Sequence, residues 1–311
     1  MPTPPPALNA ASLGPASLGI VIPAHDAAAW IGDALDSLAR QSWAEWRAIV
    51  VDDGSTDATA ALVVARGDPR VTLLRQDRGG VSAARNRGAA ALAGAAALLF
   101  LDADDWLAPD ALARLRAALA AAPDAVAAVG KFVHVDPAGT RERPHAARGG
   151  DLLVRLLTRN LFANGGHVLI RAEAAARAGG FNPDLTFAED WEYWVRLAAL
   201  GPFAAAAGPP VLFVRRRAAG AYLGRAADPA TFAPALAAAY AAPALIGRFG
   251  PRRLARLRRR MAAENLWVAG RALLWHGRRA EALALLRRAW RVRPGPKRAA
   301  ALALWHLTGG R

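Results

Sequence analysis

Short apolar runs rich in β-branched residues alternate with stretches of helical periodicity over the first two thirds of the chain. This alternation is typical of a parallel sheet covered by helices, so the predicted fold class is α/β. We predict strands at residues 19–23, 48–51, 71–74, 97–101, 125–135, 167–170 and 211–214. We predict one helix that begins at Ile31 and a second that follows residues 53–57 and runs towards Arg66. Four more helices are predicted over residues 81–93, 109–119, 172–178 and 191–200.

Beyond these elements the strand pattern disappears, and Ala, Leu and Arg recur at helical spacing. We therefore divide the chain into an α/β domain at 18–225 and a helical C-terminal region at 226–311. Residues 266–294 resemble one tetratricopeptide helix pair. Because one repeat unit cannot bury its own face, a helical cap is favoured over a protein-binding module. Residues 1–17, rich in Pro, Ala and Ser, are predicted to be a disordered leader.

Composition narrows the class of protein. Hydrophobic residues make up 54% of the 311 residues, which is enough for a sizeable core. Cysteine is absent, which excludes disulfides and thiolate metal sites and fits a reducing cytoplasm. The longest apolar runs, such as 89–101, contain glycine and end in acids, so we predict no transmembrane helix.

The formal net charge of +15 points to a polyanionic partner, whether nucleic acid, an anionic lipid surface or a phosphorylated substrate. The excess of positive charge can also arise from a bias in genome composition. Only Lys131 and Lys297 are lysines, and a GC-rich genome produces abundant Ala and Arg without selection for binding. Both interpretations stay open at this point.

Acidic residues follow two of the predicted strands. Asp52 and Asp53 end the second strand, and Asp102, Asp104 and Asp105 follow the fourth. Since ligands of open α/β sheets collect at the carboxyl ends of the strands, we expect these carboxylates near one crevice. Their mutual repulsion favours a bound cation or hydrogen-bond donors.

The spacing of Asp102 and Asp104 places both side chains on one side of an extended backbone. A pair of oxygen ligands suits Mg²⁺ or Mn²⁺, which can bridge to substrate phosphates. Alternatively, the acids form a turn or cap the following helix, Asp105 in particular ahead of Pro109. The absence of GxxxxGK[ST], and of GxGxxG after the first strand, argues against a P-loop nucleotidase or a dinucleotide oxidoreductase.

Five motifs in order carry a family resemblance: IPAHD at 22–26, VDDGSTD at 51–57, GVSAARNRG at 80–88, FLDADD at 100–105 and AEDWEYWVRLAALG at 188–201. Together they resemble the family 2 glycosyltransferases of the GT-A fold. The resemblance implies a Rossmann-like, mostly parallel sheet flanked by helices, with the α-helical C-terminal extension outside it.

The resemblance also implies roles for individual residues in binding the nucleotide. Pro23, Ala24 and Asp26 would line the nucleotide pocket. Asp52 or Asp53 would contact the base or the ribose.

Three more residues would act on the diphosphate and the sugar. Arg85 would approach the base or diphosphate, with a surface ion pair to an acid such as Asp77 as the alternative. Asp104 matches the metal-coordinating acid of the family, and Asp102 would lie nearer the ribose and sugar.

Asp190 matches the catalytic base of the family, since an inverting transfer needs a carboxylate that takes the proton of the acceptor hydroxyl. Glu189 and Asp190 also form an acidic first turn that would stabilise the dipole of the next helix, and both roles can hold together. The aromatic residues that follow favour a core face over a sugar platform: Trp191, Tyr193 and Trp194.

Two departures from the family pattern modify these expectations. Relatives carry a histidine after the last strand that completes the metal site, whereas this chain has Arg217. Arginine holds phosphate but does not ligate a metal, so the metal would have fewer protein ligands or Arg217 would partly replace it. The Gln-x-x-Arg-Trp motif of processive synthases is missing, which favours transfer of a single sugar.

The implied function is an inverting transfer of one sugar from a nucleotide-diphosphate donor, a UDP-sugar first, to a hydroxyl of a glycan or lipid-linked acceptor. This places the chain in cell-surface glycan or polysaccharide biosynthesis, with Mg²⁺ or Mn²⁺ stabilising the departing diphosphate. We expect a cytoplasmic protein with no nucleic-acid partner. A peripheral contact with the inner face of the membrane and the oligomeric state are left open.

Two other functions remain as alternatives. A sugar nucleotidyltransferase shares the sheet and the acidic metal site, but such enzymes have a basic, Gly-rich turn after the first strand, which residues 24–27 lack. A non-catalytic scaffold would act through the basic helical tail.

Overall fold

The computed structural model of the chain describes residues 17–216, 228–275 and 277–307, which form two compact units. The first unit contains Met1–Leu152, Phe162–Asp184 and Arg196–Arg216, and the second contains Leu153–Leu161, Leu185–Val195 and Arg217–Arg311. Two short segments from the region assigned to the α/β domain therefore belong to the helical unit. The expected leader lies outside the described residues apart from Ser17.

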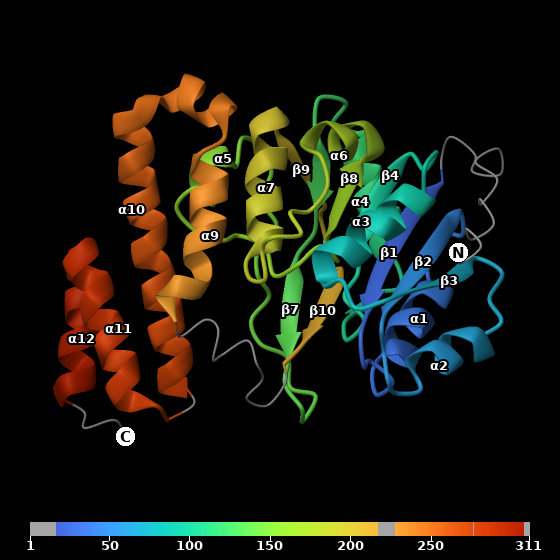
Figure 1. The fold of residues 1–311 in the computed structure, drawn as a ribbon, viewed down its shortest axis with the longest axis horizontal. Helices are drawn as coiled ribbons and strands as arrows, with labels where there is room; N and C mark the ends of the chain where they lie inside the picture. Colours follow the sequence, from blue (N-terminus) through green and yellow to red (C-terminus); the bar gives the residue numbers. More distant parts are fainter. Residues whose placement is uncertain (1–16, 217–227, 276, 308–311) are drawn as a thin grey trace. The chain divides into compact units, whose positions relative to one another are not determined.

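A seven-stranded sheet forms the centre of the first unit, with strand order β3-β2-β1-β4-β8-β6-β9 (Figure 1). Its strands are β1 (Leu18–Ala24), β2 (Trp46–Asp53), β3 (Val71–Gln76), β4 (Ala97–Phe100), β6 (Ala127–Val129), β8 (Val168–Arg171) and β9 (Phe203–Ala205). Strands β3, β2, β1 and β4 run parallel, whereas β8 pairs antiparallel with β4 and with β6. The mostly parallel sheet confirms the expected fold class.

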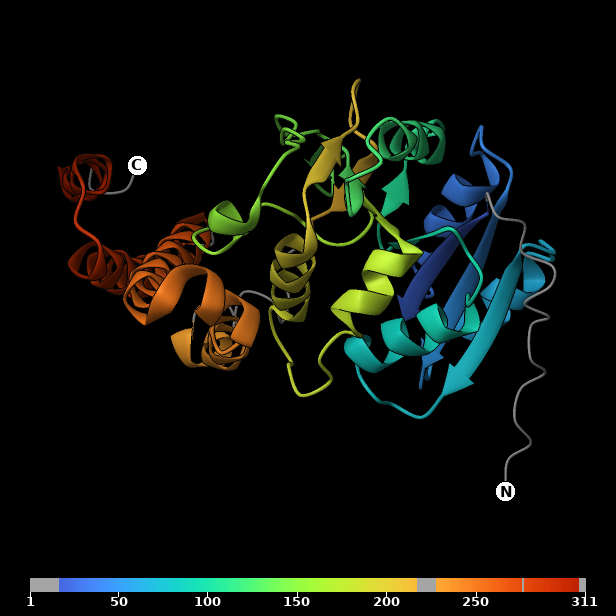
Figure 2. The ribbon, with the colours of Figure 1, turned by 90° about the horizontal axis from the view of Figure 1, so that it is seen from above.

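The alternation of side chains along β1 explains how helices cover both faces of this sheet. The helices of the first unit are α1 (Ile31–Ala39), α2 (Thr59–Ala65), α3 (Val81–Ala91), α4 (Ala111–Ala120) and α6 (Ala172–Ala178). Ile20 and Ile22 belong to the core cluster that α1 and α4 complete, while Val21 contacts Gly88 of α3 on the other face. Figure 2 shows α3 and α4 on opposite sides of the sheet.

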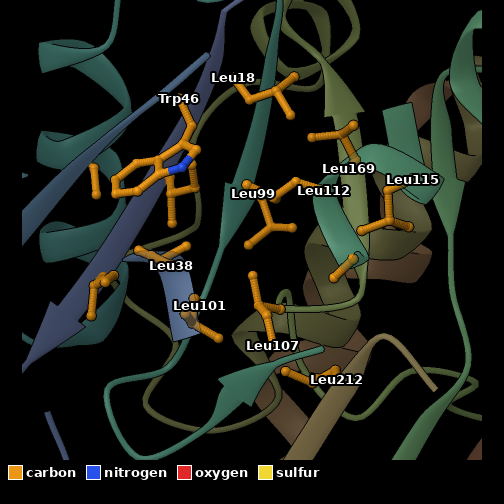
Figure 3. Packing of buried hydrophobic residues seen from close by; sticks show 14 of the residues in the cluster. Leu18, Leu38, Trp46, Leu99, Leu101, Leu107, Leu112, Leu115, Leu169 and Leu212 are labelled. Carbon is orange, nitrogen blue, oxygen red and sulfur yellow. The ribbon is translucent and has the colours of Figure 1, made fainter. Parts of the chain in front are cut away.

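The main core lies between the sheet and the pair α1 and α4 (Figure 3). Leu99 of β4 and Leu112 of α4 are fully buried in this core. Trp46, the first residue of β2, is also buried in it. Each fully buried leucine contributes about 1.5–3 kcal/mol relative to an exposed one. This packing holds β1, β2 and β4 in fixed register.

A second, three-stranded sheet in the same unit has the order β5-β10-β7. Its strands are β5 (Trp106–Leu107), β7 (Phe132–Val135) and β10 (Leu212–Arg215). The prediction of one strand over 125–135 was wrong, because β6 and β7 are separate strands in different sheets. The chain crosses between them at Gly130, where a Cβ atom would lie 2.3 Å from Val211. Strands β5 and β9 were missed, since two or three residues show no periodicity.

The second unit is helical. Its helices are α5 (Leu153–Leu156), α9 (Pro229–Tyr240), α10 (Pro243–Trp275), α11 (Arg279–Val292) and α12 (Pro296–Leu307), and α7 (Glu189–Leu200) begins in it. Gly250 interrupts α10 with φ of 70° and ψ of 160°. Helices α10 and α11 pack closely at Gly270, where a Cβ atom would lie 2.7 Å from Leu286.

The aromatic residues of α7 are buried, which confirms the core interpretation. The indole of Trp191 donates a hydrogen bond of 2.9 Å to the carbonyl of Leu156. The hydroxyl of Tyr240 donates to the carbonyl of Leu157, and burial raises the pKa of this phenol. In the part of the chain that the structure describes, no single helix has the length and apolarity to cross a bilayer. Helices α9 and α10 meet that test only as a pair bent by 106°.

Gly88→Ala should destabilise the first unit, because the new Cβ atom would lie 2.4 Å from Cγ1 of Val21 and push α3 away from β1. Overpacking of this kind costs about 1–3 kcal/mol. Gly247→Ala is the matched control, since open space surrounds this helical glycine and the change should stabilise α10 by about 0.5–1 kcal/mol. Thermal denaturation checks both, and an unchanged midpoint for Gly88→Ala would contradict the close contact.

Candidate functional site

The carboxyl ends of β1, β2 and β4 meet at one edge of the large sheet. The register pairs Ala24 with Asp52 and Val21 with Phe100. The segments that follow these strands therefore leave the sheet side by side. The acids that follow the two strands in the sequence lie at one edge, as expected from a parallel sheet.

Hydrogen bonds interlock the loop after β1 with the loop after β2. The N–H of Asp26 donates to Oγ of Ser55 at 3.0 Å, and the N–H of Thr56 donates back to Oδ1 of Asp26 at 2.8 Å. The N–H of Ala28 donates to Oδ2 of Asp57 at 2.9 Å. Asp26 has a φ of 46°, and the hydrogen bond from Thr56 is the largest cause that lowers its pKa. The DGSTD motif thus fixes the loop that carries Asp26.

Asp53 holds the turn that leads into α3. Its carboxylate accepts hydrogen bonds from the N–H groups of Gly79 at 2.7 Å and Gly80 at 2.8 Å, and from Nε2 of Gln76 at 2.7 Å. Burial acts to raise the pKa of Asp53, but these hydrogen bonds and the charge of Arg78 lower it overall. Both carboxylate oxygens are therefore bound by the protein itself.

Asp52 is buried beside Asp53 with fewer strong donors. Its Oδ1 accepts the N–H of Ser55 at 3.0 Å, and Nε of the exposed Arg75 lies 3.3 Å from Oδ2. Of the two acids proposed to contact the base or ribose, Asp52 is the better candidate, because it accepts two longer hydrogen bonds whereas Asp53 accepts three shorter ones. That contact stays a prediction.

Arg85 projects from α3 with only 5% of its side chain exposed. Its Nη2 donates to Oδ1 of Asp102 at 2.9 Å, and its guanidinium lies 5.0 Å from the ring centre of Phe181. Asn86 fixes the backbone of Phe181 through hydrogen bonds of 2.7 and 2.8 Å. Burial and pairing with Asp102 exclude the alternative that Arg85 only forms an exposed surface ion pair.

Asp105 is a structural acid with 2% of its surface exposed. Its Oδ2 accepts Nδ2 of Asn164 at 2.5 Å, and its Oδ1 accepts the N–H of Arg215 at 2.9 Å. Burial first, and then the neighbouring charges of Asp104 and Asp102, raise the pKa of Asp105 well above its usual value. Asp105 does not cap α4, because both carboxylate oxygens bind residues far from that helix. The alternative of a turn is confirmed, since the N–H of Asp105 donates to the carbonyl of Asp102 at 3.1 Å.

Asn164 was not predicted from the sequence, because it lies in a stretch without periodicity. The signal that could have found it is the following Gly165, where a Cβ atom would lie 2.6 Å from the carbonyl oxygen of Phe100. Only glycine allows this approach to the end of β4. The approach brings Asn164 to Asp105.

Arg215 fixes the backbone of Asp104 from the second sheet. The register of β10 against β5 pairs Phe213 with Trp106, which brings Arg215 to the acidic segment. Its Nε donates to the carbonyl of Asp104 at 3.0 Å, and its Nη2 donates to Oδ2 of Asp33 at 2.5 Å. The guanidinium also lies 4.8 Å from the ring centre of Trp106. The arginine run in the sequence directed attention to Arg217, which lies outside the described residues.

The acids after β4 fit a divalent cation. Asp102, Asp104 and Asp105 each offer a carboxylate oxygen within 4.8 Å of the others. An all-oxygen set suits Mg²⁺ or Mn²⁺ rather than a softer metal. Because Asp102 binds Arg85 and Asp105 is buried against Asn164, the half-buried Asp104 stays the predicted metal ligand.

Asp190 lies in the first turn of α7, in the second unit. Its Oδ1 accepts the N–H of Trp191 at 2.6 Å, and the preceding Ala188 has a φ of 59°. Glu189 and Asp190 do lie in the first turn of α7, where the sequence placed them. The role of Asp190 as base, and its approach to the acids of the first unit, stay predictions.

The family model described as glycosyl transferase family 2 matches residues 19–178, about half of the chain. The chain belongs to this family. This family 2 glycosyltransferase is 43% identical over 96 residues to the succinoglycan biosynthesis protein ExoO of Rhizobium meliloti, covering 30% of the chain and 27% of ExoO. It is 29% identical over 188 residues to the O-antigen biosynthesis protein RfbC of Myxococcus xanthus, covering 58% of the chain and 14% of RfbC. The matched segments thus span less than a third of these relatives.

Solved structures of glycosyltransferases share the fold. TarS of S. aureus, in complex with UDP-GlcNAc, matches with a TM-score of 0.68 at 15% identity, over 89% of this chain and 82% of that one. The mannosyltransferase PcManGT of Pyrobaculum calidifontis, in complex with GDP-Man and Mn²⁺, matches with a TM-score of 0.56 at 22% identity, over 94% and 79%. These matches confirm the GT-A fold for the family 2 glycosyltransferase.

Arg215→Ala should weaken Mn²⁺ binding on the order of tenfold, because it releases the backbone of Asp104. It should also lower the free energy of unfolding by about 1–3 kcal/mol, through loss of charged hydrogen bonds. Electron paramagnetic resonance titration with Mn²⁺ measures the affinity directly.

Arg114→Ala is the matched control, since Arg114 likewise binds backbone carbonyls, those of Ala207 and Pro209, and an acid, Asp110. It should cost similar stability and leave the Mn²⁺ affinity unchanged. Equal losses of affinity in both variants would show that general destabilisation is the cause.

Proposed function

We propose that this family 2 glycosyltransferase transfers a single sugar from a nucleoside diphosphate donor to a hydroxyl group, with inversion at the anomeric carbon. The observation that carries the proposal is the convergence of Asp52, Asp102 and Asp104 at the carboxyl edge of β2 and β4, beside the buried cation of Arg85. The family match supports it. The similarity to a succinoglycan biosynthesis protein and to an O-antigen biosynthesis protein also supports it.

A UDP-sugar is the donor that we propose, with Mg²⁺ or Mn²⁺ as the cation. TarS binds UDP-GlcNAc and PcManGT binds GDP-Man with Mn²⁺, so uridine and guanosine donors both occur within this fold. A cation bound there would stabilise the negative charge that develops on the departing diphosphate. Asp104 would hold it, and the hydrogen bond from Nε of Arg215 to the carbonyl of Asp104 supports this role by holding the backbone there.

The side chains of the first unit would bind and orient the donor. The loop that carries Asp26 and the buried Asp52 would hold the base and ribose, together with Pro23 and Ala24. Arg85, held by Asp102, would place a fixed positive charge beside the diphosphate, and a preoriented charge needs no rearrangement during the reaction. Asp190 would take the proton from the acceptor hydroxyl as the new bond forms.

A hydroxyl group of a glycan or a lipid-linked acceptor is the second substrate that we propose. The names of ExoO and RfbC support a glycan product. The absence of cysteine from the sequence supports action in a reducing compartment, and we propose the cytoplasm, at the inner face of the membrane.

Asp104→Asn should lower Mn²⁺-dependent hydrolysis of the donor at least about 100-fold, because the cation supplies several kcal/mol of charge stabilisation. Release of UDP from UDP-GlcNAc and UDP-glucose, and of GDP from GDP-mannose, measures it. Asp110→Asn is the control, since Asp110 directly precedes α4 and forms an ion pair with Arg114. Parental turnover in Asp104→Asn would refute the assigned role.

Asp190→Asn should reduce the kcat of transfer about 10²–10⁴-fold while UDP still raises the melting temperature, because the base acts on the acceptor. Asparagine keeps an oxygen that can accept the N–H of Trp191, so α7 should form as before. Glu189→Gln, one residue away, should retain transfer. If Glu189→Gln is the inactive variant instead, the base has been assigned to the wrong member of the pair.

A further inference from the structure

The net charge of the chain is concentrated in its C-terminal region. Residues 226–311 contain 17 of the 40 Lys and Arg residues but 3 of the 25 Asp and Glu residues. Residues 1–225 are therefore close to neutral. A compositional bias towards arginine would act along the whole chain, so it does not explain this segregation. The second unit carries nearly all of the charge of +15.

Much of this charge lies on one side of α10, in the helical segment that follows the break at Gly250. The buried side of that segment consists of Leu254, Leu257 and Met261. At 100° per residue the opposite side is occupied by Arg252, Arg256 and Arg259, with Arg253 and Arg260 next to them. All five arginines are exposed, and together we name them the arginine face.

The acids of the C-terminal region are engaged elsewhere. Glu264 binds Arg298 at 2.7 Å, Glu281 binds Arg278 at 2.7 Å, and Asp228 accepts the N–H of Ala230 at the start of α9. Across residues 228–275 and 277–307, no carboxylate forms an ion pair with the arginine face.

Among the residues that the structure describes, no ion pair therefore offsets the repulsion within the arginine face. Arg252, Arg256 and Arg260 follow one another at i, i+4 spacing, where like charges destabilise a helix by a few tenths of a kcal/mol per pair. A surface that carries many negative charges would remove this repulsion on contact.

We propose that the arginine face docks the protein on an anionic lipid surface. Large apolar side chains of the second unit also reach solvent, namely Ile246 at 46%, Trp290 at 39% and Val292 at 41% exposure. Trp290 and Val292 flank the exposed Arg291 on α11. A helical unit that exposes arginine together with tryptophan and aliphatic side chains suits the headgroup region of a bilayer. A nucleic-acid backbone would bind the arginines but would gain nothing from Ile246 and Val292, so the lipid surface is favoured.

Co-sedimentation of the full chain with lipid vesicles tests this docking without any sugar donor, so its outcome is separate from that of the proposed transfer. The protein should bind vesicles of phosphatidylcholine mixed with phosphatidylglycerol and not vesicles of phosphatidylcholine alone. Binding should weaken as salt is added, because ions screen the arginines. The combined variant Arg252→Gln, Arg256→Gln, Arg259→Gln should bind about fivefold more weakly per arginine, on the order of 100-fold in total.

The matched control changes the same number of exposed arginines in the first unit: Arg40→Gln, Arg148→Gln, Arg177→Gln. It should bind anionic vesicles like the parent protein, and the melting temperatures of both combined variants should match the parent. Equal losses in both variants would show that net charge alone attracts the protein, which overturns the arginine face as the docking surface. Parental binding by the α10 variant, or equal binding to neutral vesicles, would also overturn it. So would binding of a duplex oligonucleotide in the absence of any vesicle binding.

Discussion

The burial of negative charge at one edge of the sheet is the constraint around which the first unit is arranged. A buried carboxylate without partners costs several kcal/mol, so each acid needs donors of its own. Asp53 accepts hydrogen bonds from two backbone N–H groups ahead of α3, and Asp102 accepts one from the guanidinium of Arg85. Asp105 accepts hydrogen bonds from the side chain of Asn164 and the backbone N–H of Arg215. These donors come from separate segments, and meeting their geometry fixes the loops relative to the sheet.

The three-stranded sheet also supplies donors to these acids. Strand β10 pairs with β5 immediately after the acids, and this pairing delivers Arg215 to both Asp104 and Asp105. Asp33 on α1 then holds the other end of the guanidinium. The backbone of the predicted metal ligand is therefore held by a strand more than a hundred residues later in the chain. A rigid backbone at this position would let the carboxylate of Asp104 meet a cation without further ordering.

Sequence patterns predicted the parallel strands well because β1, β2 and β4 are apolar runs of at least four residues between clear helical stretches. They failed over residues 125–135, where an apolar run continues through a change of sheet at Gly130. They also missed Asn164 and Arg215, since each acts through a register that only the folded chain defines. The metal, base and nucleotide roles were predicted from motifs, because they concern ligands rather than contacts within the chain.

The close contact between Gly88 and Val21 also limits where Arg85 can lie. Arg85 lies one helical turn before Gly88 on the same side of α3, so the depth at which the helix backbone meets the sheet also sets how far the guanidinium reaches towards Asp102. Changing the residue at either position would displace the other. The approach of α3 to β1 therefore fixes where the positive charge of Arg85 lies relative to Asp102.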